Sequence, residues 1–356
     1  MNINMKNTIF LSSLLAVCVA TVAQADEIHE EIFFRSGTKK VDGNLTVNRL
    51  QLGELVGDVA NLIVSGKTTI NSNLSKGNAC QVQATSTLES DEIEFICATT
   101  NFTKTFSILG TVKTNKFIVS GTEEFPGTFT ITQGKLVSLS EGTPGILQIG
   151  ANVTAHAGGV FRPTYCTIGL HTEVNGGTFN VNKGATMADI TLNSGNVNIL
   201  SETESVGLIT VNNGSLSLEE AAIISDVTMN DGTLNILGDV QTGALTLNGG
   251  TINFSADSAI DLGEESLILG DKVMITLNVD TLDNTEGVVL FKNMGNVDGL
   301  DELTVKFVDA NGATKEAAVA YSNGSVVTAA IPEPTTATLS LLALAGLAVR
   351  RRRASR

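Results

Sequence analysis

Carboxylates are the side chains of this 356-residue chain best suited to catalysis. A glycosidase needs two carboxyl groups at a set separation, and a polysaccharide lyase needs a base with cations or calcium facing the uronate. Four acids of the central region could serve, namely Asp189, Asp226, Asp231 and Asp239. In the repeat described below they do not stack with a basic partner, because Lys183 and Arg162 are nearly the only cations between residues 140 and 270. We therefore expect turn and surface acids here, and we predict no catalytic residue.

The histidines and cysteines do not show the spacing of a metal site. The three histidines are dispersed and are expected on the surface or in turns, at His29, His156 and His171. No CxxC or His-x-His pattern accompanies the cysteines, so metal binding is the less favoured alternative for them. In an oxidising compartment Cys80 and Cys97 could close a short loop, and we predict a disulfide between them that leaves Cys166 alone. No metal and no cofactor is predicted.

The central region repeats with steps of 18 or 19 residues. The units are NGGTFNV (175–181), NSGNVNI (193–199), NNGSLSL (212–218), NDGTLNI (230–236) and NGGTINF (248–254). Two and four places after the glycine at the third position, every unit has an apolar residue. Such alternation is typical of a strand with one buried face. A unit this short cannot bury its own apolar face, so successive units must stack, which predicts a parallel β-solenoid.

Asparagine and glycine mark one turn in every unit. A turn entered at each coil needs a residue that tolerates positive φ, which explains the glycines at Gly177, Gly195, Gly214, Gly232 and Gly250. The asparagines two places earlier are expected to stack as a ladder, at Asn175, Asn193, Asn212, Asn230 and Asn248. The GGxGxDxUx motif of calcium-binding repeats is missing from this sequence. We favour a right-handed coil, because the hexapeptide periodicity of left-handed coils is not visible.

The chain divides into five parts by pattern. Residues 1–25 form a leader, 26–174 echo the repeat irregularly, 175–270 carry the regular repeats, 271–330 change pattern and 331–356 form a tail. We interpret 26–174 as irregular coils of the same solenoid, with 29–35 as a short helix or strand that covers its N-terminal end. Turn signals at 309–312 and 322–324 predict antiparallel hairpins, and hence a C-terminal β cap over 271–330.

The leader has the form of a secretory signal peptide. Lys6 precedes an apolar segment at 8–22, and Ala23 and Ala25 give the small-x-small pattern of a signal peptidase site. We expect signal peptidase to cleave there, so that the mature protein begins at Asp26.

The tail combines a short motif with an apolar run and a cluster of arginines. The motif Pro332-Glu333-Pro334 precedes an apolar run at 335–349, and four arginines follow, at Arg350, Arg351, Arg352 and Arg353. The run is shorter than the roughly 20 residues that cross a bilayer comfortably, and the arginines would stay on the cytoplasmic side. This order resembles the PEP-CTERM sorting signal of Gram-negative bacteria, over 331–356 alone. The resemblance implies a transmembrane helix and processing by an exosortase near the motif; a permanently retained helix is the alternative.

The charge balance excludes some partners. Between residues 26 and 331 the chain has 16 basic residues (22 minus 6) and 36 acidic ones (37 minus 1), a net charge of −20. Such a surface argues against nucleic acid and anionic membranes as partners. The chain has no Trp and two Tyr, so it offers few aromatic platforms on which a sugar could stack.

The repeat region is similar to the passenger β-helices of autotransporter-like surface proteins. Together with the signals at both ends, this predicts an exported protein of the cell surface or extracellular matrix, non-enzymatic and of structural or adhesin type. The PEP-CTERM resemblance implies association with extracellular polysaccharide. The alternative is a polysaccharide lyase or glycoside hydrolase on a β-helix scaffold.

Overall fold

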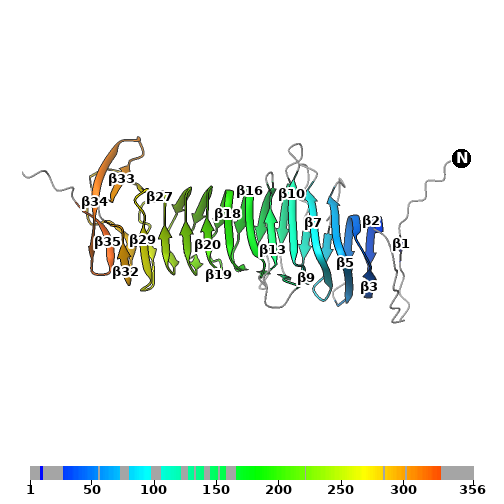
Figure 1. The fold of residues 1–356 in the computed structure, drawn as a ribbon. Coiled ribbons are helices and arrows are strands. Elements are labelled where there is room, and N and C mark those ends of the chain that lie inside the picture. The colour runs from blue at the N-terminus through cyan, green and yellow to red at the C-terminus, as the bar shows by residue number, and fades with distance from the viewer. Residues whose placement is uncertain are drawn as a thin grey trace, which may run out of the picture.

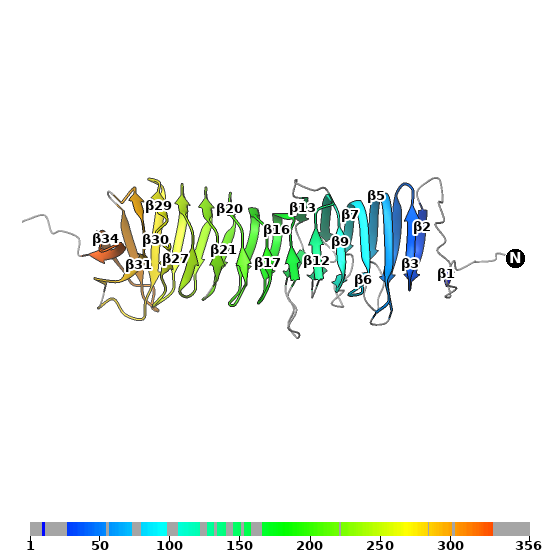
Figure 2. The ribbon, with the colours of Figure 1, turned by 90° about the horizontal axis from the view of Figure 1, so that it is seen from below.

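The computed structural model is a straight rod of stacked β-strand coils (Figures 1 and 2). It describes residues 9–10, 27–54, 57–72, 80–97, 106–121, 127–131, 134–139, 145–150, 153–157, 166–220, 222–283, 285–300 and 303–329. Each coil of the chain runs through three faces, and in each face its strand pairs in parallel with the strands of the coils before and after. The described residues form strands, turns and bends without a helix, which confirms the predicted all-β fold with solenoid-like parallel stacking.

The three faces are named here in chain order. Face 1 contains β10 (Lys116–Gly121), β13 (Ile146–Ile149), β20 (Ile209–Val211), β23 (Val227–Met229), β26 (Leu245–Leu247), β29 (Ser266–Leu269) and β32 (Asn296–Asp298). Face 2 contains β6 (Cys80–Val82), β8 (Phe106–Ile108), β11 (Gly127–Ile131), β14 (Val153–Ala157), β21 (Ser215–Leu218), β24 (Thr233–Ile236), β27 (Gly250–Phe254), β30 (Val273–Asn278) and β33 (Thr304–Val308). Face 3 contains β3 (Gly37–Val41), β9 (Thr111–Lys113), β12 (Gly134–Val137), β15 (Cys166–Ile168), β17 (Thr186–Met187), β19 (Ser205–Val206), β22 (Ile223–Ile224), β25 (Val240–Thr242), β28 (Ile260–Asp261) and β31 (Val289–Lys292).

Several long strands bend from one face into the next. Faces 1 and 2 share β2 (Glu27–Phe34), β4 (Leu45–Leu52), β16 (His171–Val181) and β18 (Ile190–Ile199), and faces 3 and 1 share β5 (Ala60–Ser72) and β7 (Thr87–Cys97). The remaining strands are β1 (Ile9–Phe10), β34 (Thr314–Ser322) and β35 (Ser325–Ala329), which lie at the two ends of the stack.

The apolar residues of the repeat form columns in the core. Phe179 pairs with Val197, Val197 with Leu216, and the same register continues through β24 and β27. All ten predicted inward residues are at most 1% exposed: Phe179, Val181, Val197, Ile199, Leu216, Leu218, Leu234, Ile236, Ile252 and Phe254. Burying each such side chain stabilises the fold by about 1.5–3 kcal/mol, so the columns are the main source of cohesion between coils.

The repeat glycines are required by backbone conformation and by space. All five have positive φ, between 69° at Gly177 and 103° at Gly214. A Cβ atom on Gly214 would lie 2.5 Å from the carbonyl oxygen of Gly195 in the preceding coil. Glycine therefore allows both the left-handed turn and the close stacking of one turn on the next.

The C-terminal cap is shorter than predicted. The strands β30, β31, β32 and β33 pair in parallel with the preceding coil, so the solenoid continues to Val308. Antiparallel pairing begins with β34, which pairs with β33 and β35, while β35 also pairs with β31. The reason is that 273–308 still carry the inward alternation, with Ile275 and Val305 buried in register. The predicted turns are confirmed, with positive φ at Asn323 and Gly324 between β34 and β35.

At the N-terminal end of the rod, inward positions that are apolar in the next coil carry polar residues. Segment 29–35 belongs mostly to β2, a strand of the first coil, with β1 paired beyond it. Glu27 and His29 stand in register with the buried Leu45 and Val47, so they occupy inward positions. Glu27 accepts a hydrogen bond from Lys39 at 3.4 Å and lies 2.9 Å from His29 Nε2. Charged inward residues at an edge discourage the addition of further strands.

Both predicted sorting signals lie outside the described residues. This applies to Ala23, Ala25 and Asp26, to Pro332, Glu333 and Pro334, and to 335–349 with the arginines that follow. Within the ranges that the structure describes, no helix is long and apolar enough to cross a membrane.

Candidate functional site

Two of the four candidate catalytic acids hold neighbouring coils together. Asp189 Oδ1 accepts a hydrogen bond from the backbone N–H of Leu208 at 2.9 Å. Asp226 Oδ1 does the same for Ala244 at 2.8 Å. In each case the donor lies one coil further along the rod, at the corner before face 1. These carboxylates satisfy backbone donors that the turn would otherwise leave without a partner.

Of the other two acids, Asp231 has a local turn contact, whereas Asp239 also links coils. Asp231 Oδ1 accepts a hydrogen bond from the N–H of Gly232 at 2.7 Å. Asp239 Oδ1 accepts one from Ala259 at 3.1 Å, and its Oδ2 pairs with Lys292 Nζ at 2.8 Å. The four acids thus lie at three different corners, with Asp189 and Asp226 at the same corner of different coils, and each accepts a hydrogen bond from the scaffold. Of the two cations considered beside them, Lys183 forms an ion pair with Glu202, and Arg162 lies outside the described residues.

The predicted Cys80–Cys97 disulfide is not formed in this structure. Cys80 is a free, fully buried cysteine at the start of β6, whose backbone pairs in register with Leu50 of β4 and with β8. The side chain of Cys97 lies outside the described residues. Burial raises the pKa of the Cys80 thiol well above its ordinary value, which makes it unreactive as a nucleophile.

The histidines contribute hydrogen bonds to the scaffold. His171 Nε2 lies 3.1 Å from the hydroxyl of Thr191 in the next coil, and His29 contacts Glu27 at the N-terminal end. The side chain of His156 lies outside the described residues. Within the described part of the chain, no three His, Cys, Asp or Glu side chains gather as a group that could hold a metal ion.

The predicted asparagine ladder is confirmed. Each Nδ2 donates to the Oδ1 of the preceding coil, over 2.7 Å from Asn193 to Asn175, 2.8 Å from Asn212 to Asn193, 2.8 Å from Asn230 to Asn212 and 2.9 Å from Asn248 to Asn230. The ladder lies at the corner between faces 1 and 2, exposed to solvent. It links five successive coils through uncharged groups alone.

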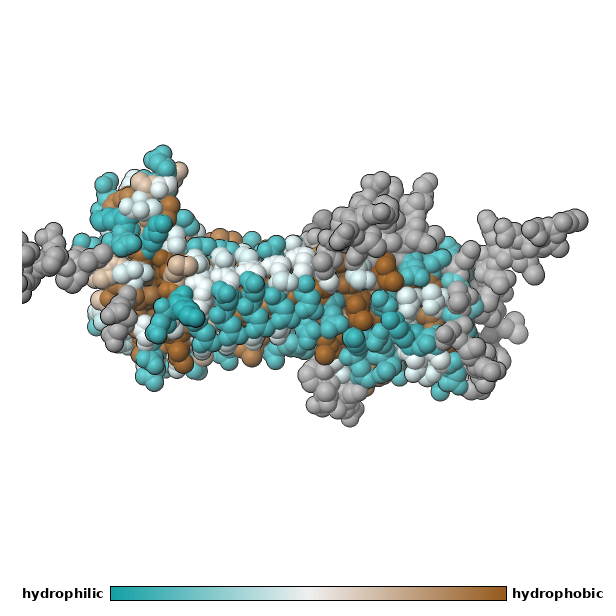
Figure 3. All heavy atoms as spheres, turned by 45° about the horizontal axis from the view of Figure 1, so that its top comes forward, coloured by the Kyte–Doolittle hydropathy of each residue, from teal (hydrophilic) through white to brown (hydrophobic). Residues whose placement is uncertain are grey.

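Face 2 carries a second column of hydrogen-bonded polar side chains, which was not predicted from the sequence. Asn198 donates to Asn180 at 2.7 Å, Asn235 to Ser217 at 3.3 Å, and Asn253 to Asn235 at 3.0 Å. The signal was present, since the residue three places after the repeat glycine is Asn in four of the five units and Ser in the third. Figure 3 shows hydrophilic and neutral bands that run along this stretch of the rod.

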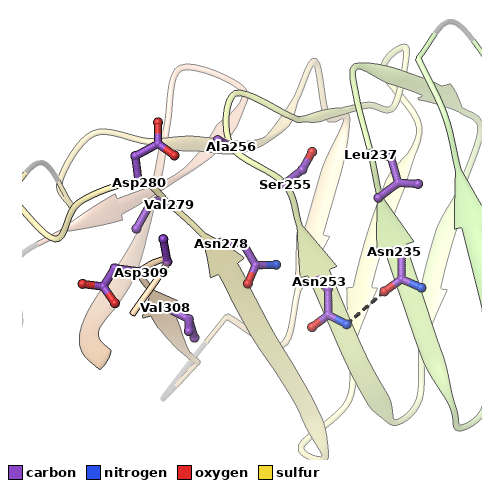
Figure 4. A pocket seen from close by; sticks show the side chains of 11 residues that line it. Asn235, Leu237, Asn253, Ser255, Ala256, Asn278, Val279, Asp280, Val308 and Asp309 are labelled. Carbon is purple, nitrogen blue, oxygen red and sulfur yellow. Dashed lines mark hydrogen bonds between the residues drawn. The ribbon is translucent and has the colours of Figure 1, made fainter. Parts of the chain in front are cut away.

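The second column ends in a groove of about 420 Å³ at the C-terminal end of the rod (Figure 4). Its floor contains polar side chains of face 2, and its sides are the residues that follow β24, β27, β30 and β33. The lining residues are Asn235, Leu237, Asn253, Ser255, Ala256, Asn278, Val279, Asp280, Val308, Asp309 and Ala310. The turn between β33 and β34, which supplies Asp309 and Ala310 to the lining, projects beyond the coils (Figure 1).

The groove is rich in hydrogen-bond acceptors. Asn253 Nδ2 and Asn278 Nδ2 both donate to the scaffold, and among the described residues none donates to the Oδ1 of either. Asp309 Oδ1 accepts from the turn at 2.9 and 2.8 Å, which leaves Oδ2 for a ligand. Asp280 is exposed at the same end (Figure 4). A groove of this kind can accept hydrogen bonds from hydroxyl or amino groups.

No protein-family model, no curated protein and no solved structure matches this chain.

Proposed function

We propose that this chain is an exported, non-enzymatic β-rod of structural or adhesin type, which acts at the cell surface or in the extracellular matrix and binds extracellular glycan. The observation that carries the proposal is the use of the candidate catalytic acids as turn residues. Asp189, Asp226 and Asp239 each accept a hydrogen bond from a backbone N–H in another coil. A general acid or base must instead present its carboxyl group to a substrate.

The route to the surface in this proposal is a right-handed β-solenoid exported by its leader and sorted by its tail. Signal peptidase would remove residues 1–25, and the helix at 335–349 would hold the chain in the membrane until an exosortase cuts near Pro332-Glu333-Pro334. The high acidic charge and the hydrogen-bonded amide ladders suit a rod that must stay soluble outside the cell.

The lyase or glycosidase alternative has less support. A lyase would need cations or calcium beside its base to hold a uronate. The groove lining has no Lys, Arg or His, and its two carboxylates come from separate turns after β30 and β33.

The mass of the intact protein recovered from the native cell surface or medium tests the route. We expect an N-terminus at Asp26 and loss of the chain beyond the Pro-Glu-Pro motif. Retention of Arg350 to Arg353 would mean a permanently anchored rod and would remove the exosortase step. Confinement of the protein to the cytoplasm would overturn the proposed function.

Catalysis is tested on the same material. We expect no turnover of neutral or acidic polysaccharides. A rate that falls when Asp280 is replaced by Asn would contradict the non-enzymatic assignment.

A further inference from the structure

We propose that the groove at the C-terminal end of the rod binds an amine-bearing sugar, such as a glucosamine unit of a deacetylated hexosamine polymer. The inference rests on the proposed glycan-binding function and names the ligand class for one site of it.

The size and the two ends of the groove suit a saccharide. A volume of about 420 Å³ lies within the range of small-ligand sites, roughly 300–1,000 Å³. Figure 4 shows Asp280 and Asp309 at one end and Leu237 at the other, with Asn253 and Asn278 between them. A ligand that fills this groove therefore meets carboxylates on one side and an apolar side chain on the other.

Apolar side chains provide contact area for the C–H groups of a sugar ring. Leu237 is 52% exposed although it is a large hydrophobic residue, and it lies in the groove lining with Val279 and Val308. In the central coils of face 2 the outward positions carry Thr, Ser and Asn, as in β21 and β24, whereas those of β30 and β33 also include the exposed Met274 and Lys306. The groove is thus a place where apolar and hydrogen-bonding groups converge on the outside of the rod, as in small-molecule sites.

The polar groups select a donor-rich ligand. Asn253 Oδ1, Asn278 Oδ1 and Asp309 Oδ2 are available as acceptors, and the exposed Asp280 adds a second carboxylate. Sugar hydroxyls can donate to the amide oxygens, and a protonated amine can donate to a carboxylate in a charge-assisted hydrogen bond, the stronger kind.

The charge of the groove decides between classes of glycan. Two carboxylates line it without a basic residue, and the chain between residues 26 and 331 has a net charge of −20 (16 minus 36). A uronate would be repelled by this field, whereas an ammonium group would be attracted to it. The expected preference is therefore amine-bearing sugar first, neutral sugar second and acidic sugar last.

Calorimetric titration of the exported protein, recovered from cells, tests this order. The probes are a glucosamine tetramer, the N-acetylated tetramer of the same linkage, and a galacturonate tetramer. We expect the glucosamine tetramer to bind most tightly, with an affinity that falls as salt is raised. Asp280→Asn should weaken it about fivefold, the upper range for one exposed ion pair.

Asp298→Asn is the matched control, because it makes the same charge change at an exposed position of β32 outside the groove lining. It should leave the affinity for the glucosamine tetramer unchanged. Equal binding of the acetylated and free-amine tetramers, equal effects of the two variants, or no binding of any probe would each overturn the proposal. These results would leave an exported protein in place, so they are distinct from a failure of the proposed function, which the location and mass of the protein decide.

Discussion

The irregular coils before residue 166 and the regular coils after it stabilise the same architecture with different polar contacts. In the irregular part, Lys67 Nζ lies 3.0 Å from Glu92 and 2.6 Å from Glu94 on face 1. In the regular part, the aligned outward column of face 1 holds uncharged hydroxyls, at Thr191, Thr210, Thr228 and Thr246. The neighbouring corner holds the asparagine ladder.

Coil length explains this difference. Lys67 pairs with Glu92 and Glu92 with Lys116, steps of 25 and 24 residues, whereas Thr172 pairs with Ile190 after a step of 18. A ladder of short amides needs the same residue at the same place in every coil. A long lysine side chain can reach two acids on neighbouring positions, so ion pairs tolerate sequence variation. The regular coils therefore depend on repetition, and the irregular coils on flexible charged side chains.

Replacing one glycine in each region by alanine should give the largest difference in the free energy of unfolding. Gly232 in a regular turn and Gly57 in the irregular part both have φ of 100°. A Cβ atom on Gly232 would lie 2.5 Å from the carbonyl oxygen of Gly214, whereas one on Gly57 would meet nothing within 4 Å. We expect Gly232→Ala to lower the free energy of unfolding by about 3 kcal/mol, from strain and overpacking together. Gly57→Ala should cost about 1 kcal/mol, from strain alone.

Urea unfolding of the two variants measures this difference. Because their φ values match, the excess for Gly232→Ala reports the close contact between stacked turns. Equal losses would mean that the regular turns can separate without cost, contrary to the tight stacking described above.

Replacing two inward threonines by valine should change the free energy of unfolding by smaller amounts and in opposite directions. Thr68 in β5 donates to Ser90 Oγ at 2.9 Å, whereas Thr172, the first threonine of β16, has a buried hydroxyl oxygen without a partner among the described residues. Thr172→Val should raise the free energy of unfolding by about 1 kcal/mol, because it removes an unsatisfied polar group. Thr68→Val should lower it by a similar amount, about 1 kcal/mol, because it breaks a buried hydrogen bond. A loss of stability in Thr172→Val would contradict this account of the boundary between the regions.

The two kinds of polar contact should respond differently to salt. Asn212→Ala removes two hydrogen bonds from the middle of the ladder and should cost about 1 kcal/mol, with little change between low and high salt. Asn248→Ala, at the last rung of the ladder, removes one hydrogen bond and should cost about half as much. Lys67→Met should cost less than about 1 kcal/mol, and the effect should shrink as salt rises. If the stability lost in Asn212→Ala depended on salt, the two regions would not differ in the kind of polar contact that stabilises them.

The same contrast separates what could be predicted from what could not. The 18-residue period determined the parallel stacking, the buried columns and the asparagine ladder, because each coil repeats one local pattern. The groove had no such signal, since it depends on how far the turns after β30 and β33 project from the rod. The predicted Cys80–Cys97 disulfide is not formed in this structure, where Cys80 is free and points into the core, since proximity in sequence says little about where two residues lie on a coil. The cap is shorter than predicted because residues 273–308 keep the inward alternation of the solenoid although they no longer follow its 18-residue period, so the change of pattern at 271 did not mark the start of antiparallel pairing.

The smallest expected effect belongs to the polar N-terminal end, which has no counterpart in the regular coils. Burial alone would raise the pKa of Glu27, but the hydrogen bond with His29 and the charge of Lys39 outweigh it, so the pKa lies below the ordinary value of 4.5. A carboxyl group whose pKa is lowered by folding stabilises the folded state above its unfolded pKa, and this stability is lost as the pH falls through the folded pKa. We therefore expect Glu27→Gln to lower the free energy of unfolding at pH 7 and to have progressively less effect below about pH 4.5.

Hydrogen exchange of the first coil and of the regular coils, compared between pH 7 and pH 3.5, measures where that stability acts. In the wild type, acid should lower the protection factors of the amides, taken relative to their intrinsic exchange rates at each pH, more in β2 and β3 than in β21 and β24. The ladder contacts of β21 and β24 carry no charge. In Glu27→Gln the acid-dependent difference at β2 should disappear. If it persists, the inward charges are not what closes this end of the rod, and the pairing of β1 with β2 becomes the better explanation.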